Sequence, residues 1–248
     1  MTVRGYKDRQ QEGLLTYSPT ASRWAQRLLV GICAMRGWVL HSADISQAFL
    51  RGVTFEELSK LEPSQPHRRV AMEVPPGSVP LLRELPGMRD FDASKEVLEL
   101  LRPGFGLKDA PRLFMLALGR ALAKLKLVPL QCDVQLFARH VDDELVLLVS
   151  THVDDLKYGG TDPYKSEMER ALAQTFDELK IESKSFLHLG LQHTQLDDFS
   201  VRMDQIAYIG QLRKVSFPSA VSLDDPLSEE HHAAFRSLLG GVAWVTQT

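Results

Sequence analysis

Apolar and polar residues alternate along this chain in blocks that predict several strands. The clearest block covers residues 145–149, a continuous run of Val and Leu that is typical of a strand buried on both faces. A second strand is expected over residues 38–44, with the opening of a helix at residues 45–50. Residues 179–193 predict a strand, a turn around Gly190 and a further strand.

A helix is predicted over residues 21–36, because apolar residues recur there at intervals of three or four. We expect this helix to pack behind the strand that ends at Asp44, with its apolar positions in the core. These positions are Trp24, Leu28, Ile32 and Met35.

Further helices are predicted over residues 113–127, after Pro111, and over residues 165–176, after Asp162 and Pro163. Between residues 53 and 95, prolines interrupt every longer pattern, so this part is predicted to be a loop-rich insertion. The prolines are Pro63, Pro66, Pro75, Pro76, Pro80 and Pro86.

The composition, 248 residues of which 44% are hydrophobic, predicts a soluble globular chain of one or two subdomains. No apolar run approaches the roughly 20 residues that span a bilayer, and the N-terminus has no signal-peptide pattern. We therefore expect no membrane association. Cys33 and Cys132 lack metal-binding spacing and are expected to be core thiols in a reducing compartment.

The formal net charge of −3 argues weakly against nucleic-acid binding, which normally uses a basic surface. Residues 1–43 differ from the rest, because six basic side chains there face two acidic ones, a local charge of +4. Such a basic segment fits contact with a nucleic-acid template, and it fits an ordinary solvated surface equally well.

Two adjacent acids, Asp154 and Asp155, follow the strand at residues 145–149 and lie near the tip of an expected hairpin. Aspartate is a common turn residue, so this pair alone is equally compatible with a plain turn. A buried strand that delivers two carboxylates to one point can instead form an oxygen-ligand site for Mg²⁺. Asp44 is the candidate third ligand, although an aspartate between a strand and a helix is often only an N-cap.

The tetrapeptide His-Val-Asp-Asp occurs twice, at residues 140–143 and 152–155. The first copy lies between two expected strands and is interpreted as a polar hairpin turn without chemistry. His188 and His193 are interpreted as partly exposed strand residues, since no third metal ligand is evident near them.

Residues 43–52, ADISQAFLRG, and residues 152–155, HVDD, resemble the first and second catalytic motifs of copia-type retrotransposon reverse transcriptases. The likeness is collinear over nearly the whole chain, which is more specific than either motif alone. Further segments that are similar to landmarks of the family lie at residues 17–23, 70–77, 100–112, 188–191, 203–209 and 235–241. The chain thus resembles the reverse transcriptase domain of a copia-type LTR retrotransposon polyprotein.

The resemblance implies an α+β fold, namely a reverse transcriptase palm with partial fingers, in which an antiparallel sheet is backed by helices. It places partial fingers at about residues 1–40 and 53–110, and the palm at about residues 41–52 and 111–195. A connection or thumb-like region would cover about residues 196–248. Much of the fingers subdomain is expected to be missing.

The resemblance also implies an RNA-directed DNA polymerase that transfers nucleotides to a primer 3′-hydroxyl with two metal ions, Mg²⁺ or Mn²⁺. The implied partners are an RNA template, a DNA or tRNA-like primer and deoxynucleoside triphosphates. Integrase and RNase H, the remainder of such a polyprotein, would be missing or separate. The expected location is intracellular, either cytoplasmic and particle-associated or nuclear.

By the same resemblance, Asp44, Asp154 and Asp155 are the catalytic carboxylates and the metal ligands. Phe49 matches the steric gate that crowds the sugar 2′ position, and a buried core phenylalanine is the alternative. A primer-grip turn is implied at Leu189 and Gly190. Further contacts with the substrate are implied for Lys108, Asp109, Arg112 and His152.

Three departures from the family pattern imply a weakened copy. His152 stands where the family has an aromatic residue before Val-Asp-Asp, and its charge can change at about pH 6.5. Asp109 replaces a glutamine and is expected to place a negative charge in the path of the triphosphate. The third departure is the missing part of the fingers. The alternative function is a catalytically inactive remnant or an adapted nucleic-acid-binding module with the same fold.

Overall fold

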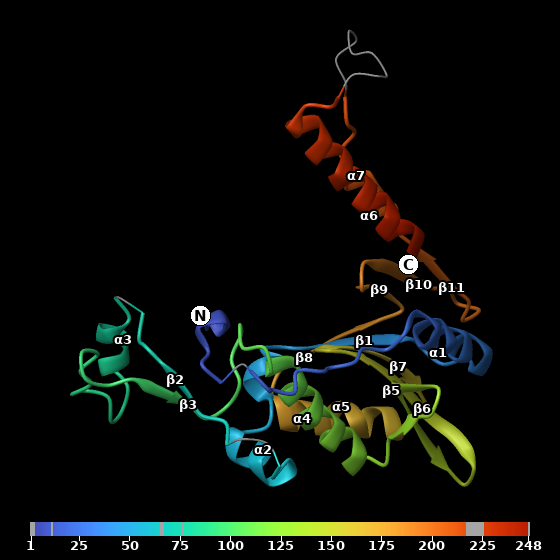
Figure 1. The fold of residues 1–248 in the computed structure, drawn as a ribbon. Coiled ribbons are helices and arrows are strands. Elements are labelled where there is room, and N and C mark those ends of the chain that lie inside the picture. The colour runs from blue at the N-terminus through green and yellow to red at the C-terminus, as the bar shows by residue number, and fades with distance from the viewer. Residues whose placement is uncertain (1–2, 11, 65–66, 76, 217–225, 248) are drawn as a thin grey trace.

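A six-stranded sheet lies at the centre of the molecule and is flanked by helices (Figure 1). In this computed structural model the protein is described over residues 3–10, 12–64, 67–75, 77–216 and 226–247. The strands follow the order β4-β5-β6-β7-β1-β8, and every neighbouring pair is antiparallel. Their bounds are β1 (His41–Ile45), β4 (Val128–Leu130), β5 (Asp133–Val141), β6 (Glu144–His152), β7 (Asp155–Gly160) and β8 (Leu179–Ser183).

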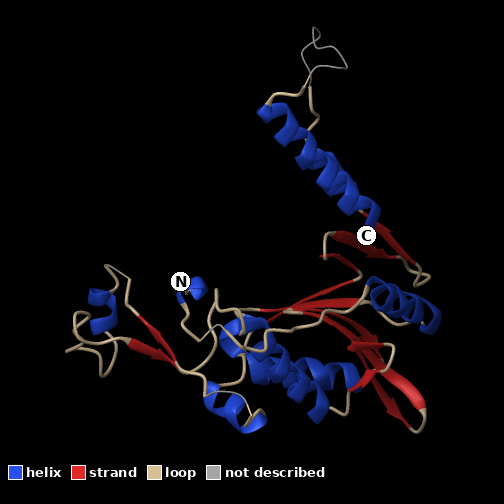
Figure 2. Ribbon diagram, in the orientation of Figure 1, coloured by secondary structure: helices blue, strands red, loops and turns tan. Residues whose placement is uncertain are grey.

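Some of the expected features fall on residues outside the described ranges. They are Pro66 and Pro76 of the predicted insertion and residues 217–225 of the predicted thumb-like region. The mixture of helices with antiparallel sheets (Figure 2) agrees with the expected α+β class.

Strand β6 confirms the prediction of a strand buried on both faces. Leu147 and Val149 belong to the core on one side of the sheet, and Leu148 belongs to the core on the other side. Successive side chains of a strand point to opposite faces, so a continuous apolar run is required where both faces are covered. The helix expected at residues 45–50 was wrong in its start, because β1 continues through Ile45 and only a short 3₁₀ helix, η2 (Ala48–Arg51), follows.

Helices α4 (Ala110–Lys124) and α5 (Tyr164–Phe176) cover one face of the sheet. Phe114 and Phe176 pack edge to face between them, with ring centroids 5.6 Å apart. Helix α4 begins earlier than the predicted residue 113, since Pro111 lies in its first turn, where a missing N–H loses no hydrogen bond.

Helix α1 (Arg23–Arg36) covers the opposite face of the sheet. The Ser22 hydroxyl caps its first turn by accepting a hydrogen bond from the Ala25 N–H at 3.2 Å, and Gly37 ends it with φ 63°. Its buried face packs on residues of β5 and β6 such as Leu136 and Leu148, and on Leu40 just before β1. That face consists of Ala25, Gln26, Leu29, Val30 and Cys33.

The prediction that the large apolar residues of α1 face the core was wrong for three of the four. Trp24, Leu28 and Met35 are 78%, 47% and 80% exposed, and only Ile32 packs against the core. The buried stripe consists instead of side chains at a spacing of four residues, Ala25, Leu29 and Cys33, which pack closely against the strands.

Between β1 and α4 the chain forms a lobe that projects from the central sheet (Figure 1). A third apolar cluster, which includes Phe55, Leu58 and Val70, lies at its root. The predicted loop-rich insertion at residues 53–95 therefore contains regular structure as well as loops. Its elements are α2 (Phe55–Leu61), β2 (Val70–Met72) and α3 (Val79–Arg83), and β2 pairs antiparallel with β3 (Leu98–Leu100).

After β8, the chain forms a three-stranded sheet and then two helices that stand away from the central sheet (Figure 1). These elements are β9 (Ser185–His188), β10 (Leu191–Gln195), β11 (Val201–Asp204), α6 (Ile206–Gln211) and α7 (Glu229–Gln247). The small sheet agrees with the predicted strand–turn–strand pattern around Gly190.

Three polar residues lie differently from the prediction. His188 and His193 are 2% and 0% exposed rather than partly exposed, because the small sheet packs them toward the central one. Cys33 is buried as predicted, but Cys132 is exposed. Among the described residues, the helices are all too short or too polar to cross a lipid bilayer.

Candidate active site

The three predicted carboxylates lie on neighbouring elements of the central sheet. Asp44 on β1 is the register partner of Asp155 on β7, and Asp155 is also the partner of His152 on β6. The Ile45 N–H donates to the carbonyl of Asp154 at 3.2 Å, which ties β1 to the β6–β7 turn. Neighbouring strands are about 4.8 Å apart, so pairing places Asp44 beside both acids of the hairpin.

The position of Asp44 inside β1 excludes its alternative role as an N-cap. Strand β1 extends one residue beyond it, and the residue before η2 is Gln47, which makes no side-chain capping bond. The carboxylate of Asp44 is therefore displayed from a strand and not used to begin a helix.

The turn that presents Asp154 is strained. Strands β6 and β7 are joined by only two residues, Val153 and Asp154, and Val153 has φ 58°. A β-branched residue rarely adopts this left-handed conformation, which costs about 1–3 kcal/mol and persists only where the surroundings impose it. Pairing on both sides of the turn imposes it here, and Asp154 is held at the tip.

Burial, together with crowding of negative charge, raises the pKa of both hairpin acids. Burial, followed by the charges of Asp154 and Asp44, raises the pKa of Asp155 to about 6. Burial also raises the pKa of Asp154, and the charge of Asp44 adds to this effect. A bound cation reverses such repulsion, so the arrangement favours a positive ion between the carboxylates.

The donor set suits the metals expected from the sequence. Mg²⁺ and Mn²⁺ take oxygen ligands, and Asp44, Asp154 and Asp155 supply carboxylate oxygens. Within the described part of the chain, no three His, Cys, Asp or Glu side chains already converge at metal-binding distances. The three aspartates fit such an ion in the chemistry and charge of their oxygen donors.

His152 stands beside these acids as a half-buried, neutral imidazole. Its Nδ1 atom is buried and has no hydrogen-bond partner among the described residues. Burial lowers the pKa of His152, although the charge of Asp154 acts in the opposite sense. The change of charge expected at about pH 6.5 is thus displaced to lower pH.

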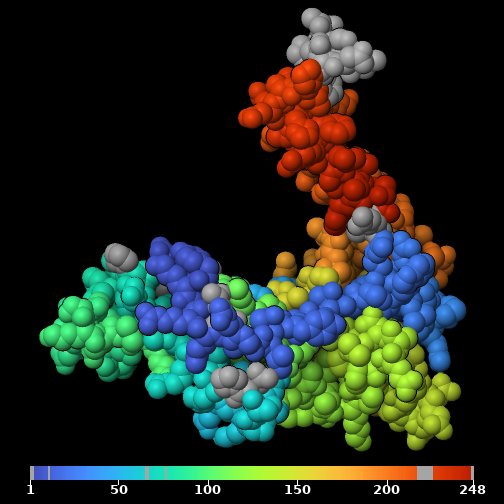
Figure 3. All heavy atoms as spheres, viewed as in Figure 1, coloured from blue at the N-terminus to red at the C-terminus, as the bar shows by residue number. Residues whose placement is uncertain are grey.

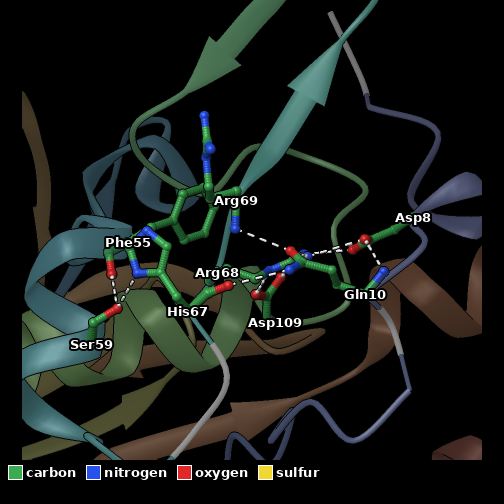
Figure 4. A network of polar contacts seen from close by, with 8 residues as sticks. All are labelled: Asp8, Gln10, Phe55, Ser59, His67, Arg68, Arg69 and Asp109. Atoms are coloured by element: carbon green, nitrogen blue, oxygen red, sulfur yellow. Dashed lines mark hydrogen bonds and ion pairs between the residues drawn. The ribbon is translucent and has the colours of Figure 1, made fainter.

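The structure corrects the expectation for Asp109. This side chain is buried and accepts hydrogen bonds from Arg68, with Nε–Oδ2 at 2.8 Å and Nη2–Oδ1 at 3.3 Å (Figure 4). It therefore places no exposed negative charge in the path of a triphosphate. Arg68 neutralises it inside the protein.

Arg68 joins three separate segments of the chain at the root of the lobe. Besides Asp109, it binds Asp8 through Nη2–Oδ2 at 2.5 Å and Nη1–Oδ1 at 3.0 Å (Figure 4). The hydrogen bond from Arg68 lowers the pKa of Asp8 despite its burial. The Arg68 side chain is 1% exposed, so this network is shielded from solvent.

The remaining predicted substrate residues lie around the same root. Lys108 is exposed beside the buried Asp109. Arg112 is ion-paired with Glu62, and it also donates to the carbonyl of Tyr17 at 3.4 Å.

Phe49 lies between two apolar clusters and is only partly buried. Its ring centroid is 5.3 Å from that of Phe105. This intermediate position is compatible with both interpretations of Phe49, the steric gate and the core side chain.

The predicted primer-grip residues form the turn between β9 and β10. Leu189 and Gly190 have φ values of 50° and 77°, the pattern of a tight hairpin turn. A side chain at Gly190 would clash with its surroundings, because a Cβ there would lie 2.2 Å from the Trp244 ring of α7. The turn therefore packs directly against the C-terminal helix.

A second buried group escaped the sequence analysis. Lys157, on the same strand as Asp155, is 2% exposed, and its Nζ lies 3.4 Å from Nε2 of His193. Burial lowers the pKa of Lys157 to about 7, that of His193 to about 4 and that of His188 to about 3. No local sequence pattern predicts the Lys157–His193 contact or the Arg68–Asp109 contact, because the partners are 36 and 41 residues apart in the sequence.

The first His-Val-Asp-Asp copy is a plain turn, as predicted. Asp142 and Asp143 connect β5 to β6, are exposed, and have φ values of 50° and 65°. This turn lies at the far end of the nine-residue strand β6, roughly 25 Å from the second copy.

Comparison with known proteins identifies a family that matches most of this chain. A family described as reverse transcriptase (RNA-dependent DNA polymerase) matches residues 1–226. The chain is 27% identical to the retrovirus-related Pol polyprotein from transposon RE1 of Arabidopsis thaliana over an aligned segment of 166 residues. This segment covers 66% of the chain. The chain is also 27% identical, over 165 residues and 65% of its length, to the corresponding polyprotein from transposon RE2. The match spans about a tenth of the length of either polyprotein.

Proposed function

The chain belongs to the reverse transcriptase (RNA-dependent DNA polymerase) family, and on this premise we propose that it is an RNA-directed DNA polymerase domain of a copia-type retrotransposon. Its substrates would be an RNA template, a DNA or tRNA-like primer and deoxynucleoside triphosphates. The observation that carries this proposal is the pairing of Asp44 with Asp155, next to Asp154, on adjacent strands.

In this proposal Asp44 and Asp154 would hold the metal ions, Mg²⁺ or Mn²⁺, and Asp155 would support the site or add a ligand. When bound, the two ions would activate the primer 3′-hydroxyl and stabilise the pyrophosphate leaving group. The contribution of the protein is to gather three carboxylates against their mutual repulsion. Strand pairing and the strained turn at Val153 supply that constraint.

Other residues would bind and select the nucleotide. The exposed Lys108 would neutralise triphosphate charge, and Phe49 would exclude a 2′-hydroxyl by occupying its space. Arg112 could take part only after leaving Glu62. His152, neutral beside the acids, would contact the substrate near the primer end. Leu189 and Gly190 would hold the primer.

We assign the subdomains accordingly. The palm would comprise about residues 41–52 and 111–195, which include the central sheet together with α4 and α5. Residues of the fingers would lie at about 1–40 and 53–110, and the thumb-like region would begin at about residue 196. The lobe around β2 and β3 and the C-terminal helices would then border the nucleic acid on two sides.

Primer extension on an RNA template tests the proposal. Extension should require Mg²⁺ or Mn²⁺, and Asp154→Asn should abolish it, because the amide removes a charge that both cations need. Asp143→Asn, in the first His-Val-Asp-Asp copy, is a matched control, since asparagine tolerates its left-handed conformation and the turn is remote.

No extension by a folded wild-type chain would reject the polymerase. Retained RNA binding in that case would support the alternative of a non-catalytic nucleic-acid-binding module. Equal loss in both asparagine variants would show that Asp154 has no special role.

A further inference from the structure

Helix α1 lies at the surface of the molecule (Figure 3). It presents a second apolar face to solvent, opposite the face that packs on the sheet. We propose that this α1 outer face, formed by Arg23, Trp24, Arg27, Leu28, Gly31 and Met35, binds single-stranded nucleic acid. Under the proposed function, on which this identification rests, the ligand is the unpaired part of the RNA template.

The exposed apolar side chains of this face require an explanation. A helix that is apolar on both sides is ordinarily buried on both sides, yet Trp24, Leu28 and Met35 remain uncovered. Trp24 is the most informative of them, because any nucleic-acid base can stack on an exposed indole ring.

The charge of the helix indicates the class of ligand. Arg23 and Arg27 lie on this face of α1, whose sequence contains no Asp or Glu, whereas Arg36 at the end of the helix pairs with Glu144 at 3.4 Å. The Arg27 guanidinium carbon lies 5.9 Å from the centroid of the Trp24 ring, so a cation and a stacking surface are presented together. Aromatic surface combined with phosphate-binding charge is the chemistry that single strands require.

The α1 outer face begins close to the candidate active site. The Ala21 N–H donates to the carbonyl of Thr151 at 3.0 Å, three residues before Asp154. The Ser150 hydroxyl donates to Oε1 of Gln26 at 3.2 Å, so the first turns of α1 are fixed to the end of β6. Arg23, Trp24 and Arg27 are thus the part of this face nearest the carboxylates, and a strand leaving them can continue along the helix.

Fluorescence anisotropy with a short labelled oligouridylate, in EDTA, measures this binding without catalysis. Trp24→Ala should weaken binding about 5- to 150-fold, the range for loss of one stacked base, and Trp24→Phe should restore most of it. The double change Arg23→Gln and Arg27→Gln should lower the slope of log Kd against log salt by about 1.4, because each single-strand phosphate contact contributes about 0.7.

Gly31 allows a matched pair of variants at the centre of this face. A side chain there meets nothing within 4 Å, so Gly31→Glu and Gly31→Gln should both fold. Only the glutamate adds negative charge, and Gly31→Glu should therefore bind more weakly than Gly31→Gln. Melting temperatures close to the wild type in all variants would exclude unfolding as the cause.

Unchanged affinity and salt slope in the Trp24 and arginine variants would overturn the proposal. Self-association that depends on Trp24 would overturn it in favour of a second copy of the chain. Trp24-dependent binding to anionic phospholipid vesicles, without binding to oligonucleotides, would overturn it in favour of a membrane surface. Equal binding of oligouridylate and oligothymidylate would support the face as a general single-strand site. Loss of primer extension with intact Trp24-dependent binding would reject the polymerase alone and leave this inference standing.

Discussion

Replacing Arg68 by glutamine removes the cation that lies between the buried carboxylates of Asp8 and Asp109. The Arg68 side chain is 1% exposed, and those of Asp8 and Asp109 are 8% and 2% exposed, so water cannot take over its hydrogen bonds. Four hydrogen bonds to the two carboxylates are lost together.

Loss of one partner from a buried ion pair costs about 3–5 kcal/mol, because the remaining charge stays desolvated without compensation. Here two carboxylates are left behind, and they also repel each other. We expect the free energy of unfolding to fall by about 3–5 kcal/mol, equivalent to a decrease of roughly 6–20 °C in Tm for a chain of this size.

Urea and thermal unfolding at neutral pH measure this effect. Arg69→Gln is the matched control: Arg69 adjoins Arg68 and pairs with Glu99 at 2.9 Å, but these side chains are 69% and 50% exposed. An exposed pair contributes little, so the control should unfold like the wild type.

The carboxylates left behind give the prediction a second signature. Without Arg68, burial and mutual repulsion should raise the pKa of both, so the loss of stability should shrink as the pH falls and they become protonated. Adding Asp109→Asn to Arg68→Gln should recover part of the loss. Equal, small effects of Arg68→Gln and Arg69→Gln, or a loss that does not depend on pH, would refute the reasoning.

Three further predictions concern the small sheet and the nucleotide site. The free energy of unfolding should fall as the pH drops below about 6.5. The folded-state pKa values of His188 and His193, about 3 and about 4, lie below the unfolded value. The two histidines therefore stay neutral in the folded protein while the unfolded chain takes up protons. At about pH 5 each should contribute a loss of about 2 kcal/mol, and urea titrations should show a weaker pH dependence for His188→Leu. Gly190→Ala should lower the free energy of unfolding by about 1–2 kcal/mol or more, because alanine is strained in the left-handed conformation and its Cβ would also clash with Trp244. Tryptophan fluorescence can report the clash, and a variant as stable as the wild type would contradict the packing of this turn. Phe49→Val should increase ribonucleotide relative to deoxynucleotide incorporation if Phe49 is the gate. A loss of about 1–3 kcal/mol with an unchanged incorporation ratio would instead identify it as a core side chain.

The sequence alone predicted the elements that depend on local pattern. The apolar run at residues 145–149 predicted a strand buried on both faces, and the two acids after it predicted a hairpin tip. Both predictions are confirmed by β6, β7 and the two-residue turn between them. Strand periodicity and turn chemistry act over a few residues, so they are readable without knowledge of the rest of the chain.

The family motifs predicted which acids belong together, but only the sheet brings Asp44 beside Asp155. These residues are separated by more than 100 positions, and their pairing depends on the insertion of β1 between β7 and β8. Their catalytic role stays a prediction, because pairing establishes proximity and does not measure chemistry.

Tertiary structure also decided which face of a helix is buried and which charged side chains are buried. Helix α1 has apolar residues on two sides, and its periodicity alone cannot tell which side meets the sheet. Asp109 was predicted to repel the substrate because its partner, Arg68, is 41 residues away. Burial and charge pairing depend on whatever the fold places nearby, so distant neighbours set them and local spacing does not.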